Sequence, residues 1–313
     1  MLNKTQKLFN YENPNKSMNK SLFKRRKFND KFINTLFLLP MIIPFLITVL
    51  IPFFVGIYYS MTDWNGFQVN NFVGLANYRT IFENQDFIYS LLITVIFTVI
   101  SIIVINVIAF ALALLCTTNM KFNNFCRAAF FLPNMVGGIV LGYVWMFIFN
   151  RVFILIYPTS FLTDPNLSLV ALIIVSTWQA AGYMMMIYIT GLQTIDTSIL
   201  EASEIDGASA WTTMRRIKIP LVMNTFTICV FLTLVRSFQM FDLNFALTGG
   251  GPATVIDGRV IQSTELIALN IYNSAILRQE FALGQAKAVL FFLVLVIISL
   301  TQVWISKKSE VEI

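Results

Sequence analysis

Hydrophobic residues fall into six long runs along the chain, separated by shorter polar segments. The runs cover roughly residues 33–60, 88–115, 128–149, 168–191, 221–241 and 282–305. As a helix, each run is long enough to cross a hydrocarbon core, which takes about 20 residues. Backbone groups in lipid are satisfied only within helices or closed barrels, and the sequence lacks the alternating pattern of barrel strands. We therefore predict an all-α, polytopic membrane protein with six transmembrane helices within residues 32–306.

Charge orients these helices. Only 12% of the residues are charged, against about 25% in ordinary soluble domains. With six crossings, sixteen of the 22 Lys and Arg residues lie on the side of the N-terminus and four on the other side. Because basic residues concentrate in the cytoplasm, we predict that both tails, 1–31 and 307–313, are cytoplasmic. The net charge of +6 then reflects topology, and it predicts no nucleic-acid partner. The N-terminal basic cluster is expected to act as a solvated anchor, and contact with anionic membrane lipid is the alternative.

A polar, helix-forming stretch at 197–220 separates the fourth and fifth runs. Thr197 or Ser198 is a plausible N-cap, Gly207 permits a turn with positive φ, and Pro220 is expected to close the second arm. The predicted topology places this helical hairpin in the cytoplasm. A charged, capped hairpin also occurs in loops that bind nothing, and its spacing alone leaves both interpretations open.

The fourth run carries a polar stripe. Ser176, Gln179, Ala180 and Tyr183 follow the i, i+3, i+4, i+7 spacing of one helix face. Hydroxyl, amide and phenol groups beside an aromatic ring suit a sugar, whose rings have an apolar face and a rim of hydroxyls. Hydrogen bonds between helices, worth about 0.6 kcal/mol each, explain the same stripe, and the residues do not choose between the two.

The fifth run is the most polar of the six. It contains Thr233, Arg236 and Gln239. A charge inside a membrane costs at least about 2.5 kcal/mol, so Arg236 is expected to face an aqueous path or a carboxylate. Since Arg236 lies near the end of its run, its side chain could also snorkel to the interface.

Three segments, in order, resemble those of carbohydrate permeases. The hairpin resembles the EAA loop of bacterial ABC importer permeases, which docks on an ATPase subunit. The segment 73–78, Val-Gly-Leu-Ala-Asn-Tyr, and the segment 241–252, ending Gly-Gly-Gly-Pro, resemble outer loops of the same family. The chain is therefore similar to the first permease subunit of maltose-type and glycerol-phosphate-type systems, with the type I importer fold. The hairpin positions matched or included are Glu201, Ala202, Ser203, Asp206, Gly207 and Pro220.

This resemblance implies partners and a substrate path. The partners are a second permease in a heterodimer, two ATPase subunits and an extracytoplasmic sugar-binding protein, all at a prokaryotic cell membrane. The chain itself is expected to bind no cofactor or metal and to perform no catalysis, because ATP and Mg²⁺ belong to the ATPase. Sugar-contacting positions of the family fall near Ser176, Thr177, Ala180, Tyr183 and Thr233, and polar character adds Gln179, Arg236 and Gln239.

Two other classes of function fit less well. An ion-coupled secondary transporter needs carboxylates in mid-membrane, but all 16 acidic residues are expected in loops or at helix ends. An enzyme needs a cluster of acid, base or metal-binding groups, and the sequence has no histidine and no phosphate-binding GxxxxGK[ST] motif. We favour a neutral oligosaccharide as substrate, although Arg236 and Lys287 would also permit an anionic sugar.

Overall fold

The computed structural model describes residues 35–118, 122–156, 159–256 and 258–307, and the chain divides into two units, Met1–Tyr58 and Tyr59–Ile313. Most of the two predicted tails therefore lies outside the described residues. The helical run Thr35–Ser60 includes a wide π turn, η1 (Leu46–Leu50), followed by α2 (Ile51–Ser60). Pro52 has no N–H to donate to the carbonyl of Thr48, which lies within the π turn that ends two residues before the proline.

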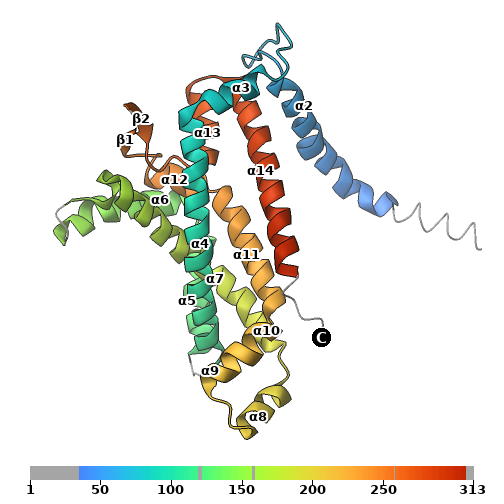
Figure 1. Ribbon diagram of the computed structural model, residues 1–313, viewed down its shortest axis with the longest axis vertical. Coiled ribbons are helices and arrows are strands. Elements are labelled where there is room, and N and C mark those ends of the chain that lie inside the picture. Colours follow the sequence, from blue (N-terminus) through green and yellow to red (C-terminus); the bar gives the residue numbers. More distant parts are fainter. Residues whose placement is uncertain (1–34, 119–121, 157–158, 257, 308–313) are drawn as a thin grey trace, which may run out of the picture. The chain divides into compact units, whose positions relative to one another are not determined.

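Four long helices form the body of the second unit. They are α4 (Gln85–Thr117), α7 (Pro165–Gln193), α11 (Met223–Phe238) and α14 (Phe281–Lys307). Helix α4 packs against α7 and α11, and α11 packs against α14 (Figure 1). In the described part of the chain, five helices are long and apolar enough to cross a membrane, or six when α11 is joined to the helix before it across a 70° bend. The predicted helical, multi-span architecture is confirmed.

The third candidate span is Gly138–Leu155, whereas the predicted run 128–149 is broken near residue 136, so the predicted bounds of this span were wrong. Helix α5 (Asn123–Met135) ends at Val136, and α6 (Gly138–Phe147) begins after Gly137, continuing into η2 (Ile148–Val152) and η3 (Phe153–Leu155). Both residues between α5 and α6 have extended backbone. Hydropathy reports only that a run prefers an apolar environment, whereas the pair Gly137 and Gly138 has low helix propensity and permits the break.

Short elements gather at the end of the second unit where α14 begins, and we call this the α3 end (Figure 1). They are α3 (Ala76–Glu83), α13 (Ile267–Tyr272) and η6 (Asn273–Leu277). Elsewhere η4 (Phe161–Thr163) precedes α7, and α12 (Asp242–Leu247) packs against α6. The Gly-Gly-Gly-Pro loop leads into an antiparallel pair, β1 (Ala253–Ile256) and β2 (Arg259–Gln262), which hydropathy did not predict.

Candidate functional site

The polar hairpin lies at the end of the second unit opposite the α3 end (Figure 1). Its first arm is α8 (Thr197–Ile205), and the N-cap is Asp196, so the prediction of Thr197 or Ser198 was wrong by one or two residues. The Asp196 carboxylate accepts the backbone N–H of Ser198 at 2.9 Å. This backbone hydrogen bond, helped by the Ser198 hydroxyl, lowers the pKa of Asp196 below its ordinary value. A capping side chain accepts a backbone N–H two or three residues further along the chain. The residue that caps the Ser198 N–H is therefore Asp196, which precedes the first helical residue, Thr197.

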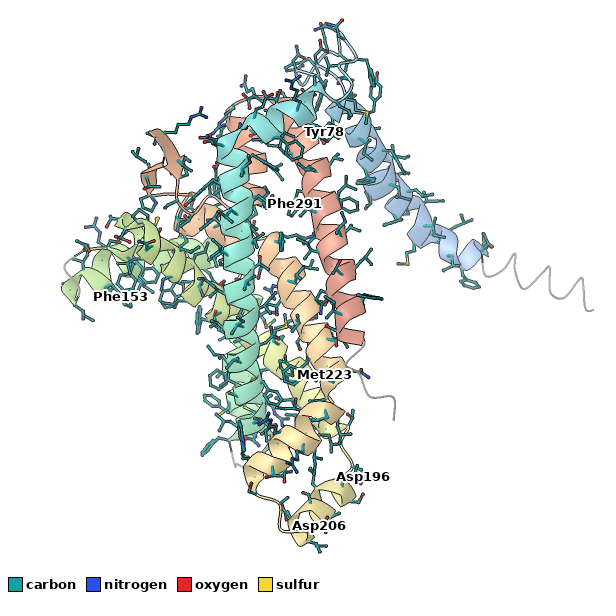
Figure 2. The ribbon with its side chains drawn as sticks, viewed as in Figure 1. Tyr78, Phe153, Asp196, Asp206, Met223 and Phe291 are labelled. Carbon is teal, nitrogen blue, oxygen red and sulfur yellow. The ribbon has the colours of Figure 1, made fainter. Side chains whose placement is uncertain are left out.

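The turn has the geometry that glycine favours. Gly207 has φ +73°, as predicted. Its N–H donates to the Glu204 carbonyl, and the N–H of Ala208 donates to the Ser203 carbonyl, both at 3.0 Å. This pair of bonds is a Schellman motif, which satisfies carbonyls left free at the end of a helix. Figure 2 labels Asp196 and Asp206 at the two ends of this first arm.

The second arm continues into a spanning helix. It comprises α9 (Ala210–Thr213), the π turn η5 (Met214–Lys218) and α10 (Ile219–Leu221). Pro220 lies inside α10 and does not close the arm, so that prediction was wrong; the wide π turn before Pro220 accommodates the missing N–H. The chain bends by 70° at Val222, and α11 starts at Met223, labelled in Figure 2.

The hairpin presents an exposed polar surface. Glu201, Ala202, Asp206 and Gly207 are exposed. Ser203 is buried instead, where its hydroxyl donates to the Leu200 carbonyl and lies 3.4 Å from the Thr213 hydroxyl on the second arm. Ser203 therefore joins the two arms.

Two large apolar side chains accompany this surface. Ile205 is 87% exposed and Trp211 is 71% exposed, one on each arm. Exposed aromatic and aliphatic side chains on a rigid element are typical anchors of a protein interface. The sequence analysis did not single out either residue, although both stand in an otherwise polar stretch.

A polar chamber of about 410 Å³ lies beside the break between α5 and α6. Its backbone wall is formed by Val136, Gly137 and Gly138. The polar side chains that line it are Asn134, Gln179, Arg236, Gln239 and Asp242. Three of the predicted path residues, Gln179, Arg236 and Gln239, therefore meet at one cavity.

Two hydrogen bonds shape this chamber. Arg236 Nη1 donates to Asn134 Oδ1 at 2.9 Å, and Gln179 Nε2 donates to the Val136 carbonyl at 3.1 Å. The second bond satisfies a carbonyl at the helix break. Within the described ranges no carboxylate oxygen lies within 4.0 Å of Arg236, so its guanidinium keeps donors for other acceptors.

Thr233 does not line the chamber. It is buried, accepts from Asn106 Nδ2 at 3.2 Å and donates to the Cys229 carbonyl at 2.8 Å. Asn106 also accepts the Tyr188 hydroxyl at 2.8 Å. This buried triad joins α4, α7 and α11. An Asn in the middle of an apolar run was the signal in the sequence that could have revealed it.

The remaining predicted path residues on α7 are not among those that line the chamber. The Ser176 hydroxyl donates to the Ile173 carbonyl of its own helix. Thr177 lines a separate apolar groove of about 380 Å³ between α4, α5 and α7. Ala180 and Tyr183 pack with the apolar cluster around Met184, and Tyr183 also lies near enough to Arg236 to interact with its charge. The four residues of the helical stripe therefore lie in three environments. Gln179 lines the chamber, Ser176 bonds to its own helix, and the other two pack in the apolar cluster.

Comparison with known sequences gives a family and relatives. The family described as "Binding-protein-dependent transport system inner membrane component" matches residues 109–311. The chain is 43% identical over 284 residues to the "Probable starch degradation products transport system permease protein AmyD" of Thermoanaerobacterium thermosulfurigenes, which covers 88% of this chain and 94% of the relative. It is 30% identical over 295 residues to the "Multiple sugar-binding transport system permease protein MsmF" of Streptococcus mutans, covering 91% and 99%.

Comparison with solved structures gives the same fold. A chain from the "Crystal structure of a bacterial ABC transporter involved in the import of the acidic polysaccharide alginate" superposes with a TM-score of 0.76. The match covers 92% of this chain and 99% of that chain at 19% identity. At this identity the likeness is one of fold.

Proposed function

The chain belongs to the family of binding-protein-dependent transport system inner membrane components, and from this premise we propose that it is the permease subunit of an ATP-driven importer of neutral oligosaccharides. One observation carries the proposal. Helix α11 begins at the base of the polar hairpin, and at its other end Arg236 in the last turn and Gln239 just after the helix line the polar chamber. A single rigid element therefore joins the surface suited to a partner with the cavity suited to a sugar.

The mechanism uses α11 as a lever. Two ATPase subunits bind the hairpin of this chain and that of a second permease, and closure of the ATPase dimer upon ATP binding draws the hairpins together. Because the hairpin continues through α10 into α11, the movement tips α11 and changes access to the chamber. Glu201, Ala202, Asp206, Gly207, Ile205 and Trp211 form the docking surface in this proposal.

Topology and partners follow from the same proposal. The hairpin and both termini lie in the cytoplasm, and the α3 end faces outward, where an extracytoplasmic binding protein delivers the sugar. ATP and Mg²⁺ bind to the ATPase subunits, so this chain performs no chemistry. Its partner permease supplies the other half of the translocation path.

The substrate class rests on the chamber. A neutral sugar presents hydroxyls that both donate and accept, and the chamber offers a guanidinium, three amides and the Asp242 carboxylate. A carboxylate in the same wall opposes an anionic ligand, so Arg236 serves as a hydroxyl donor. The name of the 43%-identical relative favours oligosaccharides released from starch.

The test uses the complete complex in proteoliposomes with its binding protein. We expect uptake of malto-oligosaccharides that requires ATP and binding protein. Arg236→Ala should leave this uptake within a few-fold of wild type, because a neutral sugar needs no counter-charge and the three amides of the chamber remain to bind its hydroxyls. Abolished uptake in an assembled Arg236→Ala complex would instead indicate an anionic sugar. Uptake by the isolated chain on a proton or sodium gradient would replace the importer with a secondary transporter.

A further inference from the structure

A fully buried lysine lies in a helix proposed to span the membrane. Lys287 is in the second turn of α14 and has 0% exposed surface. It does not line the polar chamber. A buried ionisable residue in a membrane helix requires partners and marks a functional site by default. The proposed transport mechanism does not use Lys287.

The ammonium group has three contacts, one from each of three neighbouring elements. Lys287 Nζ donates to Asn270 Oδ1 on α13 at 2.9 Å and to the Ser274 hydroxyl on η6 at 2.6 Å. The same nitrogen lies 5.6 Å from the centre of the Phe87 ring on α4, within the range of a cation–π contact. The charge is therefore held where α4, α13, η6 and α14 meet.

Glu265 carries the opposite charge and is linked to Lys287 through the side-chain amide of Asn270. Glu265 is 3% exposed, and its Oε2 accepts Asn270 Nδ2 at 3.1 Å while its Oε1 accepts Asn273 Nδ2. Asn270 thus accepts from the lysine and donates to the glutamate. Hydrogen bonds to a charged group are stronger than those between neutral groups. Because Asn270 takes part in both bonds, the bond to Lys287 and the bond to Glu265 strengthen each other.

Apolar side chains cover this relay. Ile81, Phe87, Ile267 and Ala286 form a buried cluster. Tyr78 and Phe291, labelled in Figure 2, pack against it. Low dielectric around the relay makes the loss of one partner costly, because the remaining charge has no water to replace it.

The glutamate is also connected to the wall of the chamber. The backbone N–H of Leu266, next to Glu265, donates to Asn244 Oδ1 at 3.2 Å, and Asn244 Nδ2 donates to the Thr264 carbonyl at 2.8 Å. Asn244 is buried in α12, two residues after Asp242, which lines the chamber. Hydrogen bonds therefore run from α14 to the helix that carries Asp242.

We propose that Lys287 and Glu265 are positioning residues that lock α13 and α12 against α14 and so fix Asp242 in the wall of the sugar chamber. This inference rests on the proposed function in one respect, that the chamber holds the sugar. It also removes Lys287 from the residues available to an anionic substrate, because all its contacts lie in the relay.

The experiment compares Lys287→Met, Glu265→Gln and the double variant in the assembled transporter. Arg278→Met is the matched control, since Arg278 forms a partly exposed ion pair with Asp86 at 3.6 Å at the same end. We expect each single variant to lower the melting temperature of the complex by roughly 5–10 °C and the double variant to recover most of it. Arg278→Met should change it by less than about 2 °C.

Uptake separates positioning from a purely structural role. Each single variant should raise the KM for sugar-loaded binding protein about 5-fold or more in complexes of normal composition, and the double variant should return within about 2-fold of wild type. A fall in melting temperature with unchanged KM overturns the proposal, as does a double variant no better than the singles. If the singles fail to assemble, recovery of assembly in the double variant supports the relay and continued failure refutes it.

The proposed function has its own control. Wild-type complex that shows no ATP-dependent sugar uptake would refute the importer of neutral oligosaccharides. The thermal comparison of the four variants would still decide whether Lys287 and Glu265 are coupled.

Discussion

Replacement of Gly207 by alanine tests whether the polar hairpin must keep its shape to engage a partner. Gly207 has φ +73°, and a Cβ built on it meets nothing within 4 Å. The change therefore adds no clash, and its only cost is the left-handed backbone, about 1–2 kcal/mol for a residue with a Cβ. The hairpin can escape this strain only by opening the Schellman turn.

Opening the turn has a comparable cost. It breaks the bonds from Gly207 to Glu204 and from Ala208 to Ser203, each worth about 0.5–1.5 kcal/mol. Because the strain and the cost of opening are comparable, the Gly207→Ala hairpin divides between the closed and open shapes, and association with the ATPase should weaken about 2- to 5-fold, the factor by which the closed, docking-competent shape is depleted. Asn tolerates this backbone region better, and Gly207→Asn should weaken it less.

The assay measures ATPase binding to the permease pair in nanodiscs, followed by sugar uptake. Gly258→Ala is the matched control, because Gly258 has φ +76° and also meets nothing within 4 Å, but follows β1 far from the hairpin. It carries the same backbone strain and should leave ATPase affinity unchanged. Equal affinity in the Gly207→Ala and wild-type complexes, or equal losses in both alanine variants, would refute the reasoning.

Five further substitutions, two of them controls, test helix packing and the cap of α8. Gly182→Ala should prevent stable assembly, because its Cβ would lie 1.8 Å from the Phe130 carbonyl oxygen, while Gly137→Ala, with nothing within 4 Å, should melt like wild type. Thr233→Val should lower thermal stability by about 1 kcal/mol through the lost Asn106 bond and leave the KM for sugar unchanged; a raised KM would return Thr233 to the substrate path. Asp196→Ala should speed hydrogen exchange in the first turn of α8 at pH 7 whereas Asp196→Asn should not. Because the folded pKa of Asp196 is lowered, this stabilisation is present above about pH 4 and is lost as pH falls through the folded pKa.

The helices and the hairpin turn could be predicted from the sequence because local chemistry fixes them. Long apolar runs require helices in lipid, and Gly207 in a polar stretch indicates a turn with positive φ. The two predictions about the hairpin that were wrong, its N-cap and the role of Pro220, each depend on a single backbone hydrogen bond. The cap is Asp196 because its carboxylate reaches the Ser198 N–H, and Pro220 continues the arm because a π turn precedes it.

The chamber could be predicted only in part, since it depends on a break that hydropathy does not register. Gln179, Arg236 and Gln239 were selected for being polar in apolar runs, and they meet because α5 stops at Met135. Asn134 was missed for the same reason, as a continuous helix gave it no special place. Glu265 was classed with the loops, although tertiary contacts bury it.

The geometry of α11 sets a requirement on any transport cycle. Its 16 residues, at about 1.5 Å per residue, form a lever of about 24 Å, so a tilt of about 10° about the hairpin moves the chamber end by about 4 Å. The bond from Arg236 to Asn134 is 2.9 Å long, and hydrogen bonds weaken beyond about 3.2 Å. Helix α5 must therefore follow α11, or this bond must break, each time the lever tips. The extended backbone at Val136 and Gly137 separates α5 from α6, whereas Gly182 of α7 packs closely on the Phe130 backbone of α5, so a moving α5 is expected to carry α7 and not α6.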